Sequence, residues 1–328
     1  MKINYIFRHP EVGFSIQRVF QTVNLGVKKV FDTEETFLPK PKSNIPAILE
    51  NGMFARKKQL DINHITGDAH YLVYFLNKSN TVVTVHDIMY YSYLSGIKKK
   101  LWKILYIDSL KRAKKVIFIS EFAQQQVLNE INLAENQYSI IPNPVSPDFT
   151  FKQKKFNTVK PVILHIGGKM ERKNLARTIQ ALENISCHLR IIGKLSKKNS
   201  LLLKEYRTDF SNVFNLTNEE IVLEYENCDI VNFPSLFEGF GMPIIEGQAV
   251  GRIVVTSNIP PMNQVAGGGA VLVEPTDITS IKKAYKNIIA SDIFREKMIL
   301  KGLENVEKYK LSTITNQYTG LYNELIEK

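Results

Sequence analysis

The sequence predicts a protein of the α/β class with two domains, each built on a parallel sheet. Two observations support this prediction. Short apolar or β-branched runs alternate with segments of helical spacing along the whole chain, which is typical of parallel strands joined by right-handed helical crossovers. A proline-rich stretch, residues 140–149, interrupts the repeat near the middle of a chain of 328 residues. We therefore expect domains over residues 1–150 and 160–311, joined by a short linker.

The composition is that of an ordinary globular protein. Hydrophobic residues make up 44% of the chain, and no apolar run is long enough to span a membrane. The first residues lack the long apolar segment of a signal peptide and predict a first strand instead. Cys187 and Cys228 each adjoin an apolar strand, so we expect buried thiols in a cytoplasmic protein rather than a disulfide or a metal site.

The chain is basic, with a net charge of +11 from 43 basic and 32 acidic residues. Between Lys98 and Lys115, eight basic residues accompany the single acid Asp108 and several apolar residues. A basic amphipathic helix can lie on an anionic membrane surface, and we expect such contact through residues 98–115. The alternative is a solvated helix face above a core stripe. No nucleic-acid-reading motif accompanies the charge, so nucleic acid is not an expected partner.

The first domain is predicted to begin with a strand over residues 2–7, a loop, and a helix over residues 16–27. Gly13 lies in this loop, where it either contacts a phosphate at the helix start or forms a simple turn. A β-branched run over residues 81–85 leads into His86. Ligands gather at the carboxyl ends of parallel strands, so His86 is well placed to meet one. A histidine bonded to a backbone carbonyl is the alternative.

Polar residues mark the expected starts of three helices. Ser120 is the expected N-cap of a helix over residues 122–130, and Asn218 is the expected N-cap of a later one. Residues 311–326 have amphipathic spacing, with Ser312 or Thr313 as the expected cap.

In the second domain, a strand over residues 162–166 runs into two glycines and then reaches Arg172 and Lys173. Two adjacent cations at the end of a strand can clamp a diphosphate, because arginine offers a planar fork of donors and lysine a point charge. A solvated basic loop is the alternative.

A second strand, turn and helix surround Gly239 and Gly241. Both glycines let the backbone approach a ligand, and Pro243 suits the first turn of a helix whose free N–H groups form an anion site. Glu238 and Glu246 frame the turn with seven residues between them. Their carboxylates can accept hydrogen bonds from sugar hydroxyls, so a sugar attached to a phosphate fits the pattern. On spacing alone, two solvated glutamates on a surface loop fit it equally well.

The run from Glu238 to Glu246, Glu-Gly-Phe-Gly-Met-Pro-Ile-Ile-Glu, resembles the Glu-x7-Glu signature of retaining glycosyltransferases of family 4. Arg172-Lys173-Asn174 resembles the phosphate-binding element of the same family, and Thr84-Val85-His86-Asp87 resembles its histidine motif. The resemblance implies the GT-B architecture, in which two Rossmann-like domains face a central cleft. It also implies that the C-terminal helix, residues 312–328, packs back on the first domain.

The resemblance assigns roles to individual residues. His86 and Glu238 are the expected catalytic residues. The expected donor-binding residues are Gly13, Arg172, Lys173, Gly239, Phe240, Gly241, Met242 and Glu246. His64, Asp68 and His70 resemble the family's preceding loop and are expected to face the acceptor.

The implied reaction is transfer of a sugar from a UDP- or GDP-sugar to a hydroxyl of a saccharide or lipid-linked acceptor, with retention at the anomeric carbon. Such transfer belongs to bacterial-type polysaccharide or lipid-linked glycan synthesis, at the inner face of the membrane. The sequence has no Asp-x-Asp motif, so we expect protein cations in place of a metal, and no cofactor. A nucleotide-sugar epimerase of the same architecture and a catalytically silent subunit are the alternatives.

Overall fold

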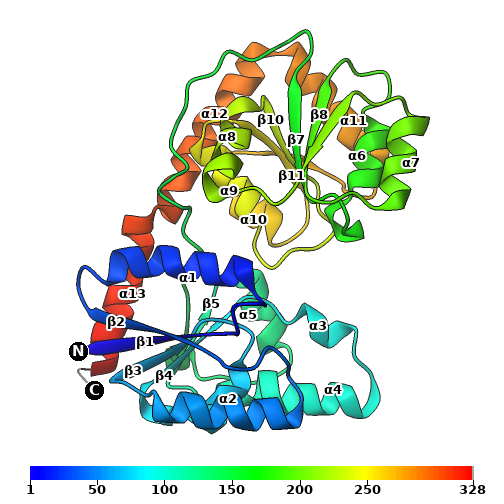
Figure 1. Cartoon of the computed structure of the whole chain (residues 1–328). Helices are drawn as coiled ribbons and strands as arrows, with labels where there is room; N and C mark the ends of the chain where they lie inside the picture. Colours follow the sequence, from blue (N-terminus) through cyan, green and yellow to red (C-terminus); the bar gives the residue numbers. More distant parts are fainter. Residues whose placement is uncertain (327–328) are drawn as a thin grey trace. The chain divides into compact units, whose positions relative to one another are not determined.

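The computed structural model describes residues 1–326 and divides into two compact units (Figure 1). Unit 1 comprises residues 1–144 together with the C-terminal segment that begins at residue 311, and unit 2 comprises residues 145–310. Each unit holds a six-stranded sheet, and every strand pairing described is parallel. The predicted α/β class with two parallel sheets is therefore confirmed.

The sheet of unit 1 has its first strand next to one edge, with the second strand on one side and the later strands on the other. Its order is β2 (Asp32–Phe37), β1 (Lys2–Phe7), β3 (Ile62–Ile65), β4 (Thr81–Val85), β5 (Lys115–Phe118) and β6 (Tyr138–Ile140). Helices cover both faces, and Figure 1 shows α1 on one face and α2 on the other. The helices of this unit are α1 (Phe14–Val27), α2 (Ile45–Lys57), α3 (Met89–Ser92), α4 (Gly96–Trp102), α5 (Glu121–Leu128) and α13 (Leu311–Ile326).

The sheet of unit 2 has its first strand, β7, at the centre, with later strands on both sides. Its sheet order is β12 (Val271–Val273), β11 (Ile253–Ser257), β10 (Ile230–Phe233), β7 (Val162–Ile166), β8 (His188–Ile192) and β9 (Phe210–Val213). The helices are α6 (Leu175–Ala181), α7 (Lys197–Glu205), α8 (Asn218–Asn227), α9 (Met242–Ala249), α10 (Met262–Ala266), α11 (Ile278–Ala290) and α12 (Asp292–Val306).

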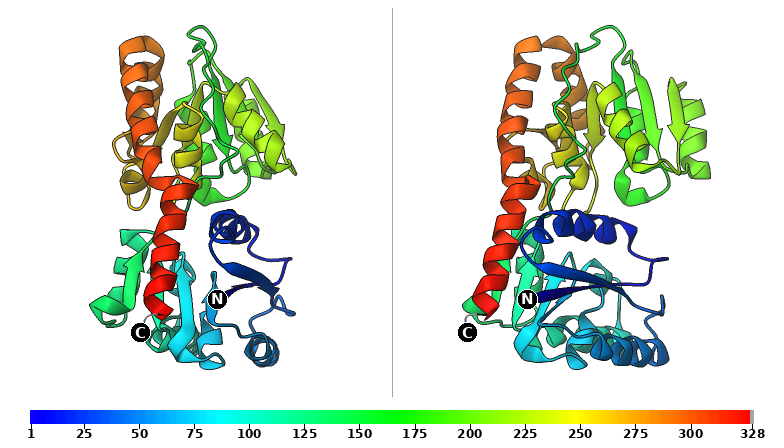
Figure 2. Two further views of the ribbon diagram at one scale, coloured as in Figure 1. Left: turned by 90° about the vertical axis from the view of Figure 1, so that its left-hand side faces the viewer. Right: turned by 60° about the vertical axis from the view of Figure 1, so that its left-hand side comes forward.

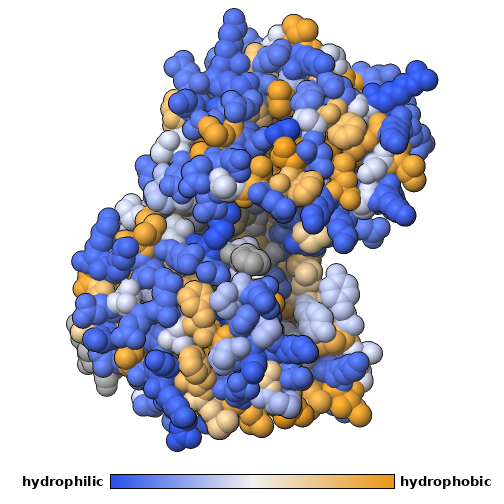
Figure 3. Space-filling model, viewed as in Figure 1, coloured by the Kyte–Doolittle hydropathy of each residue, from blue (hydrophilic) through white to orange (hydrophobic). Residues whose placement is uncertain are grey.

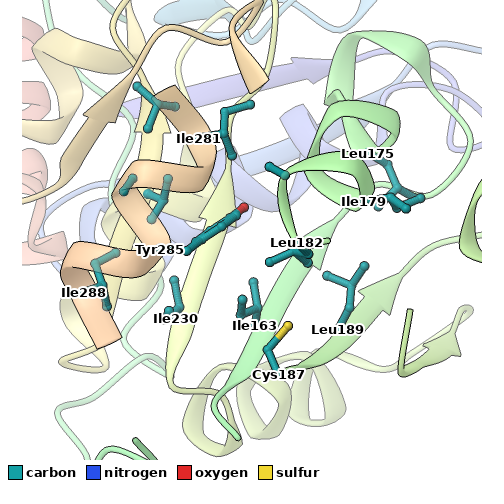
Figure 4. Packing of buried hydrophobic residues seen from close by; sticks show 14 of the residues in the cluster. Ile163, Leu175, Ile179, Leu182, Cys187, Leu189, Ile230, Ile281, Tyr285 and Ile288 are labelled. Atoms are coloured by element: carbon teal, nitrogen blue, oxygen red, sulfur yellow. The ribbon is translucent and has the colours of Figure 1, made fainter. Parts of the chain in front are cut away.

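The core of unit 2 lies between the sheet and the helices α6 and α11. Ile281, Tyr285 and Ile288 recur on one side of α11, as core-facing residues of a helix should, and Figure 4 shows them directed towards Ile163 and Ile230 of the central strands. All five side chains are fully buried. The two cysteines are buried free thiols, as predicted.

The C-terminal helix α13 packs within unit 1 against α1, and Figure 2 shows the two helices side by side. The contact is close, because a Cβ atom on Gly26 would lie 1.9 Å from the Thr315 hydroxyl. The helix begins at Leu311, so Ser312 and Thr313 fall in its first turn and the predicted cap is wrong. Residues 327 and 328 of the predicted helix lie outside the described residues.

Two further predicted caps have different outcomes. Ser120 accepts a hydrogen bond from the Ala123 N–H at 3.1 Å and caps α5 as predicted. The cap of α8 is Thr217 and not Asn218. Thr217 accepts from the Glu220 N–H at 3.2 Å while the Glu220 carboxylate accepts from the Thr217 N–H at 2.7 Å. This reciprocal capping box satisfies two N–H groups at once and fixes the helix start one residue earlier.

The predicted amphipathic helix over residues 98–115 is shorter than expected. Regular α-helix ends at Trp102, a wider π-turn follows over Lys103–Ile107, and Lys115 already begins strand β5. Ile107 and Leu110 are fully buried, so only the first part of this stretch can meet a membrane surface. Within residues 1–326, no helix combines the length and the apolar character needed to cross a bilayer.

His64 is a structural residue of unit 1, and the expectation that it faces the acceptor is wrong. Its ring is fully buried on β3, where Nδ1 lies 2.6 Å from the Tyr322 hydroxyl of α13 and Nε2 lies 2.8 Å from the Thr84 hydroxyl of β4. Burial lowers the pKa of His64 to about 3. His64 therefore stays neutral and ties α13 to the sheet.

Acid should destabilise unit 1 through His64. In the unfolded chain this histidine binds a proton near its ordinary pKa of 6.5, whereas the folded protein excludes that proton down to about pH 3. The unfolded state thus holds more protons between these values, and stability falls as the pH drops below 6.5. Between pH 7 and pH 5 we expect a loss of about 2 kcal/mol from this group.

Urea unfolding followed by tryptophan fluorescence measures this loss, because the single tryptophan, Trp102, lies in unit 1. His64→Gln should remove this part of the acid sensitivity, and the partly exposed His9→Gln should leave it unchanged. Equal acid sensitivity in His64→Gln and the wild type would contradict the prediction.

Candidate functional site

The candidate site of unit 2 lies where the order of its strands reverses. From β7 the chain continues to β8 and β9 on one side, and then returns to β10, β11 and β12 on the other. Because β7 and β10 are adjacent and parallel, the loops that leave their carboxyl ends lie at the same edge of the sheet, where parallel sheets bind ligands. These loops are residues 167–174 and 234–241, which contain the cations and the first glutamate of the predicted site.

Two cations from the first loop meet one carboxylate from the second. Lys173 Nζ lies 2.7 Å from Glu238 Oε1, and Arg172 Nη1 lies 2.6 Å from Glu238 Oε2. Backbone contacts fix the two loops together, because the Leu236 N–H donates to the Arg172 carbonyl at 2.7 Å and Arg172 Nη1 donates to the Phe237 carbonyl at 3.2 Å. The predicted clamp residues therefore converge, and each is paired with Glu238.

Lys173 is held in a place that disfavours its charge. The residue is 9% exposed, and its ammonium lies 4.4 Å from the centre of the Phe233 ring. Burial lowers the pKa of Lys173, while the charge of Glu238 and the hydrogen bond to it act in the opposite direction. Glu238, also 9% exposed, is thus the partner that keeps this buried cation charged. An incoming diphosphate can take over that role.

The turn before α9 supplies N–H donors beside this ion-pair cluster. Gly241 has φ 115°, and a Cβ atom there would lie 2.9 Å from Ile244 Cδ1, so glycine is required. The helix begins at Met242 with Pro243 in its first turn, as predicted. A helix start leaves N–H groups without intrahelical acceptors, and these attract an anion.

Phe240 cannot contribute its side chain to a ligand. The side chain is buried and packs edge-on against Tyr309, with 5.8 Å between ring centres. Its backbone N–H is the only donor that it can offer at this turn.

Glu246 lies one turn into α9 and has a partner that the sequence did not indicate. The Tyr225 hydroxyl of α8 donates to Glu246 Oε2 at 2.5 Å. Tyr225 is fully buried, so it fixes the orientation of this carboxylate. The two residues are 21 positions apart and share no local pattern, so only the fold brings them together.

The remaining two predicted residues belong to unit 1. Gly13 caps α1 with φ 80°, and a Cβ atom there would meet only Arg8 Cδ at 3.9 Å. His86 follows β4, is largely buried, and has Nε2 2.9 Å from the Thr66 carbonyl oxygen. Burial lowers the pKa of His86, so the ring is neutral. Its Nε2–H donates a hydrogen bond to the Thr66 carbonyl oxygen. This contact matches the alternative that the sequence left open, a histidine bonded to a backbone carbonyl. The catalytic role of His86 stays a prediction.

His70 is also less available than expected. Its Nδ1 lies 2.6 Å from the Tyr106 carbonyl oxygen, and its side chain is buried. The expectation that His70 faces the acceptor is therefore wrong. Asp68 is the member of this loop that stays accessible, with a side chain that is 46% exposed and an ion pair to Arg8 at 3.5 Å.

Two protein families match the chain. Residues 147–304 match "Glycosyl transferases group 1", and residues 20–149 match "Glycosyltransferase Family 4". The two matches follow the division into units closely, and together they extend from residue 20 to residue 304.

Curated relatives carry the names of mannosyltransferases. The O-antigen chain mannosyltransferase RfbU of Salmonella typhimurium is 29% identical over 64% of this chain and 61% of its own length. The O-antigen chain mannosyltransferase B of Escherichia coli is 23% identical over 78% of this chain and 73% of its own length. The chain thus spans somewhat less than two thirds of the first of these relatives.

Solved structures show the same fold over the whole chain. The sucrose-phosphate synthase of Thermosynechococcus elongatus superposes with a TM-score of 0.80 at 16% identity, covering 100% of this chain and 99% of its own. The Anabaena protein Alr3699/HepE, solved in complex with UDP and glucose, superposes with a TM-score of 0.74 at 14% identity, covering 99% and 100%. Both are GT-B structures, which confirms the predicted architecture. With its two matched families and the Glu238-to-Glu246 signature, the chain belongs to glycosyltransferase family 4.

Proposed function

We propose that this glycosyltransferase moves a sugar from a nucleoside-diphosphate donor to an acceptor hydroxyl with retention of configuration, and that its own cations do the work of a metal. One observation supports the proposal above others: Arg172 and Lys173 converge on Glu238 at the strand switch point, beside the start of α9. Cations, N–H donors and carboxylates at one edge of the sheet match the diphosphate and the hydroxyls of a sugar nucleotide.

The residues of unit 2 divide the chemistry between them. When the bond between sugar and diphosphate breaks, negative charge grows on the leaving oxygens. Lys173, Arg172 and the N–H groups of residues 239–242 stabilise this charge, at about 3–4 kcal/mol for each well-placed donor. Glu238 exchanges its cations for sugar hydroxyls, and Glu246, oriented by Tyr225, accepts from the ribose. His86 of unit 1 remains the proposed second catalytic residue.

The names of the relatives suggest a biosynthetic process and a donor for this chain. RfbU and mannosyltransferase B are named for O-antigen chains, so we propose a role in bacterial polysaccharide synthesis, with a mannosyl donor as the first to test. UDP is bound in the Anabaena structure and GDP is the alternative. Buried free thiols are typical of cytoplasmic proteins, so the proposed location is cytoplasmic.

Binding of nucleoside diphosphates tests the donor site directly. We expect either UDP or GDP, and not the matching nucleoside, to stabilise the protein, because Arg172, Lys173 and the α9 turn bind the diphosphate. At 100 times its Kd such a ligand adds ~2.7 kcal/mol of stability, which thermal unfolding detects as a shift of several degrees.

The stereochemistry is tested separately. NMR of the product formed from an α-linked donor should show an α-linkage at the first time point. A β-linked product would overturn retention, and the absence of any shift with UDP, GDP or other nucleoside diphosphates would overturn the donor site itself.

A further inference from the structure

The chain enters unit 2 through a segment, residues 145–152, that contains neither helix nor strand. Figure 1 shows the chain running from here along the outside of unit 2 before it reaches β7, and hydrophilic residues predominate on that side in Figure 3. Of residues 147–152, only Phe149 is buried. One buried aromatic ring in an exposed segment indicates that this ring is the segment's anchor.

Backbone hydrogen bonds hold segment 145–152 at both ends. The Val145 N–H donates to the Tyr309 carbonyl at 2.8 Å, and the Lys152 N–H donates to the Val250 carbonyl at 3.2 Å. Arg252 Nη1 donates to the Lys152 carbonyl at 2.8 Å. Because Val250 directly follows α9, the segment is fixed to the end of that helix.

The anchor ring packs on a tyrosine of the donor half of the chain. Phe149 meets Tyr225 of α8 edge-on, with 5.2 Å between the ring centres and 80° between the ring planes. Edge-to-face contact is a favoured geometry of aromatic pairs and contributes beyond the burial of area. Both rings are buried, so the position of the Tyr225 ring depends on the ring that it packs against.

Tyr225 carries this contact on to a carboxylate. Its hydroxyl lies 2.5 Å from Glu246 Oε2, so printed contacts form an unbroken series from Phe149 to Glu246. A glutamate side chain has three rotatable bonds, and a carboxylate without a fixed partner samples several rotamers. Glu246 is only partly buried, so its backbone surroundings do not fix it in the way that a core position would.

We propose that Phe149 and Tyr225 are positioning residues of the donor site. The ring of Phe149 holds Tyr225 in place, and the Tyr225 hydroxyl fixes the Glu246 carboxylate in the orientation that accepts hydrogen bonds from the ribose. Segment 145–152 is then a working part of the donor site as well as a connection between the units. The inference rests on the proposed function, in which Glu246 binds the ribose.

The preference for ribose tests the proposal, because it reports on Glu246 and not on the diphosphate. Calorimetry with the whole chain compares UDP or GDP, whichever binds, with its 2′,3′-dideoxy analogue. The wild type should prefer the ribose form at least ~10-fold, since hydrogen bonds to a charged group change an equilibrium constant by roughly 10- to 100-fold. Tyr225→Phe keeps the ring but removes the hydroxyl. It should lower this preference at least ~5-fold and change the affinity for the analogue by less than about twofold.

Phe149→Ala should lower the ribose preference in the same direction, and the more conservative Phe149→Leu should lower it less. Because both positions act through one carboxylate, the double variant Phe149→Ala, Tyr225→Phe should lose little more than Tyr225→Phe alone. Tyr285→Phe is the matched control. It removes the hydroxyl of another fully buried tyrosine of unit 2, which donates to Asn232 at 2.7 Å, and it should leave the ribose preference unchanged.

The possible failures are distinguishable. A wild type that binds no nucleoside diphosphate would overturn the proposed function and this inference with it. A wild type that binds the diphosphate without preferring ribose would overturn the inference and leave the diphosphate site standing. Full ribose preference in Tyr225→Phe, equal weakening of both ligands, or the same loss in Tyr285→Phe would also overturn it. Unchanged preference in both Phe149 variants would remove segment 145–152 from the site.

Discussion

Replacing Lys173 with alanine is expected to lower kcat/KM for sugar transfer at least ~100-fold. Lys173 is buried between Glu238 and the Phe233 ring, so its charge acts at short range in a poorly hydrated place. Electrostatic stabilisation of the growing charge on the diphosphate is strongest in such a place. The same substitution should weaken binding of the nucleoside diphosphate, because this product carries the same diphosphate that Lys173 stabilises in the transition state.

Steady-state transfer from the donor and calorimetry with the nucleoside diphosphate measure the two effects. Lys297→Ala is the matched control, since Lys297 is an exposed lysine of α12 with no part in the proposed site. It should change neither quantity by more than about twofold, because surface charges contribute little. Normal turnover in Lys173→Ala would remove Lys173 from the diphosphate site.

Local patterns predicted the elements that carry this site. The turn around Gly241 was predictable because a positive φ requires glycine and the first turn of a helix accepts Pro243, and both constraints act within a few residues. The parallel sheets followed from strands that alternate with helices. These patterns reflect local backbone constraints, so they can be recognised without knowledge of the tertiary packing.

The sequence alone did not predict which residues of distant segments pair with one another. Arg172 and Lys173 lie about 65 positions from Glu238, and the sequence placed all three in a ligand site without indicating that they pair with one another. Tyr225 was missed for the same reason, because nothing near it in the chain marks Glu246 as its partner. The exposed apolar residues of α2 have ordinary helical spacing, and only the folded structure shows that no core covers them.

The stretch over residues 98–115 shows how an amphipathic pattern can mislead. Basic and apolar residues continue to Lys115, but Ile107 and Leu110 face the core and the chain must enter β5 at Lys115. The helical pitch changes after Trp102, and the apolar residues before the change are exposed whereas Ile107 and Leu110 are buried. His64 misled in a similar way. Its residue type suggested a ligand, whereas its place on an inner strand covered on both faces made it structural.

Replacing Glu238 with glutamine should separate catalysis from diphosphate binding. Glutamine keeps the shape of the side chain but loses the charge that holds Arg172 and Lys173. We expect kcat to fall on the order of 100-fold, because the sugar loses the group that positions it. The nucleoside diphosphate should bind as tightly as before or more tightly, since it no longer competes with a protein carboxylate for the two cations. This is the opposite of the effect expected for Lys173→Ala.

Without ligand, the Glu238→Gln variant should also be less stable than the wild type. A buried cation without its partner costs about 3 kcal/mol, and the nucleoside diphosphate should recover most of that loss because it replaces the missing negative charge. Urea unfolding with and without the ligand measures both, and Glu296→Gln on the exposed side of α12 is the control. If Glu238→Gln weakened diphosphate binding as much as Lys173→Ala does, Glu238 would organise the clamp rather than compete with the ligand. The carboxylate would then have to stay between the two cations while the donor is bound, and the sugar would need another partner.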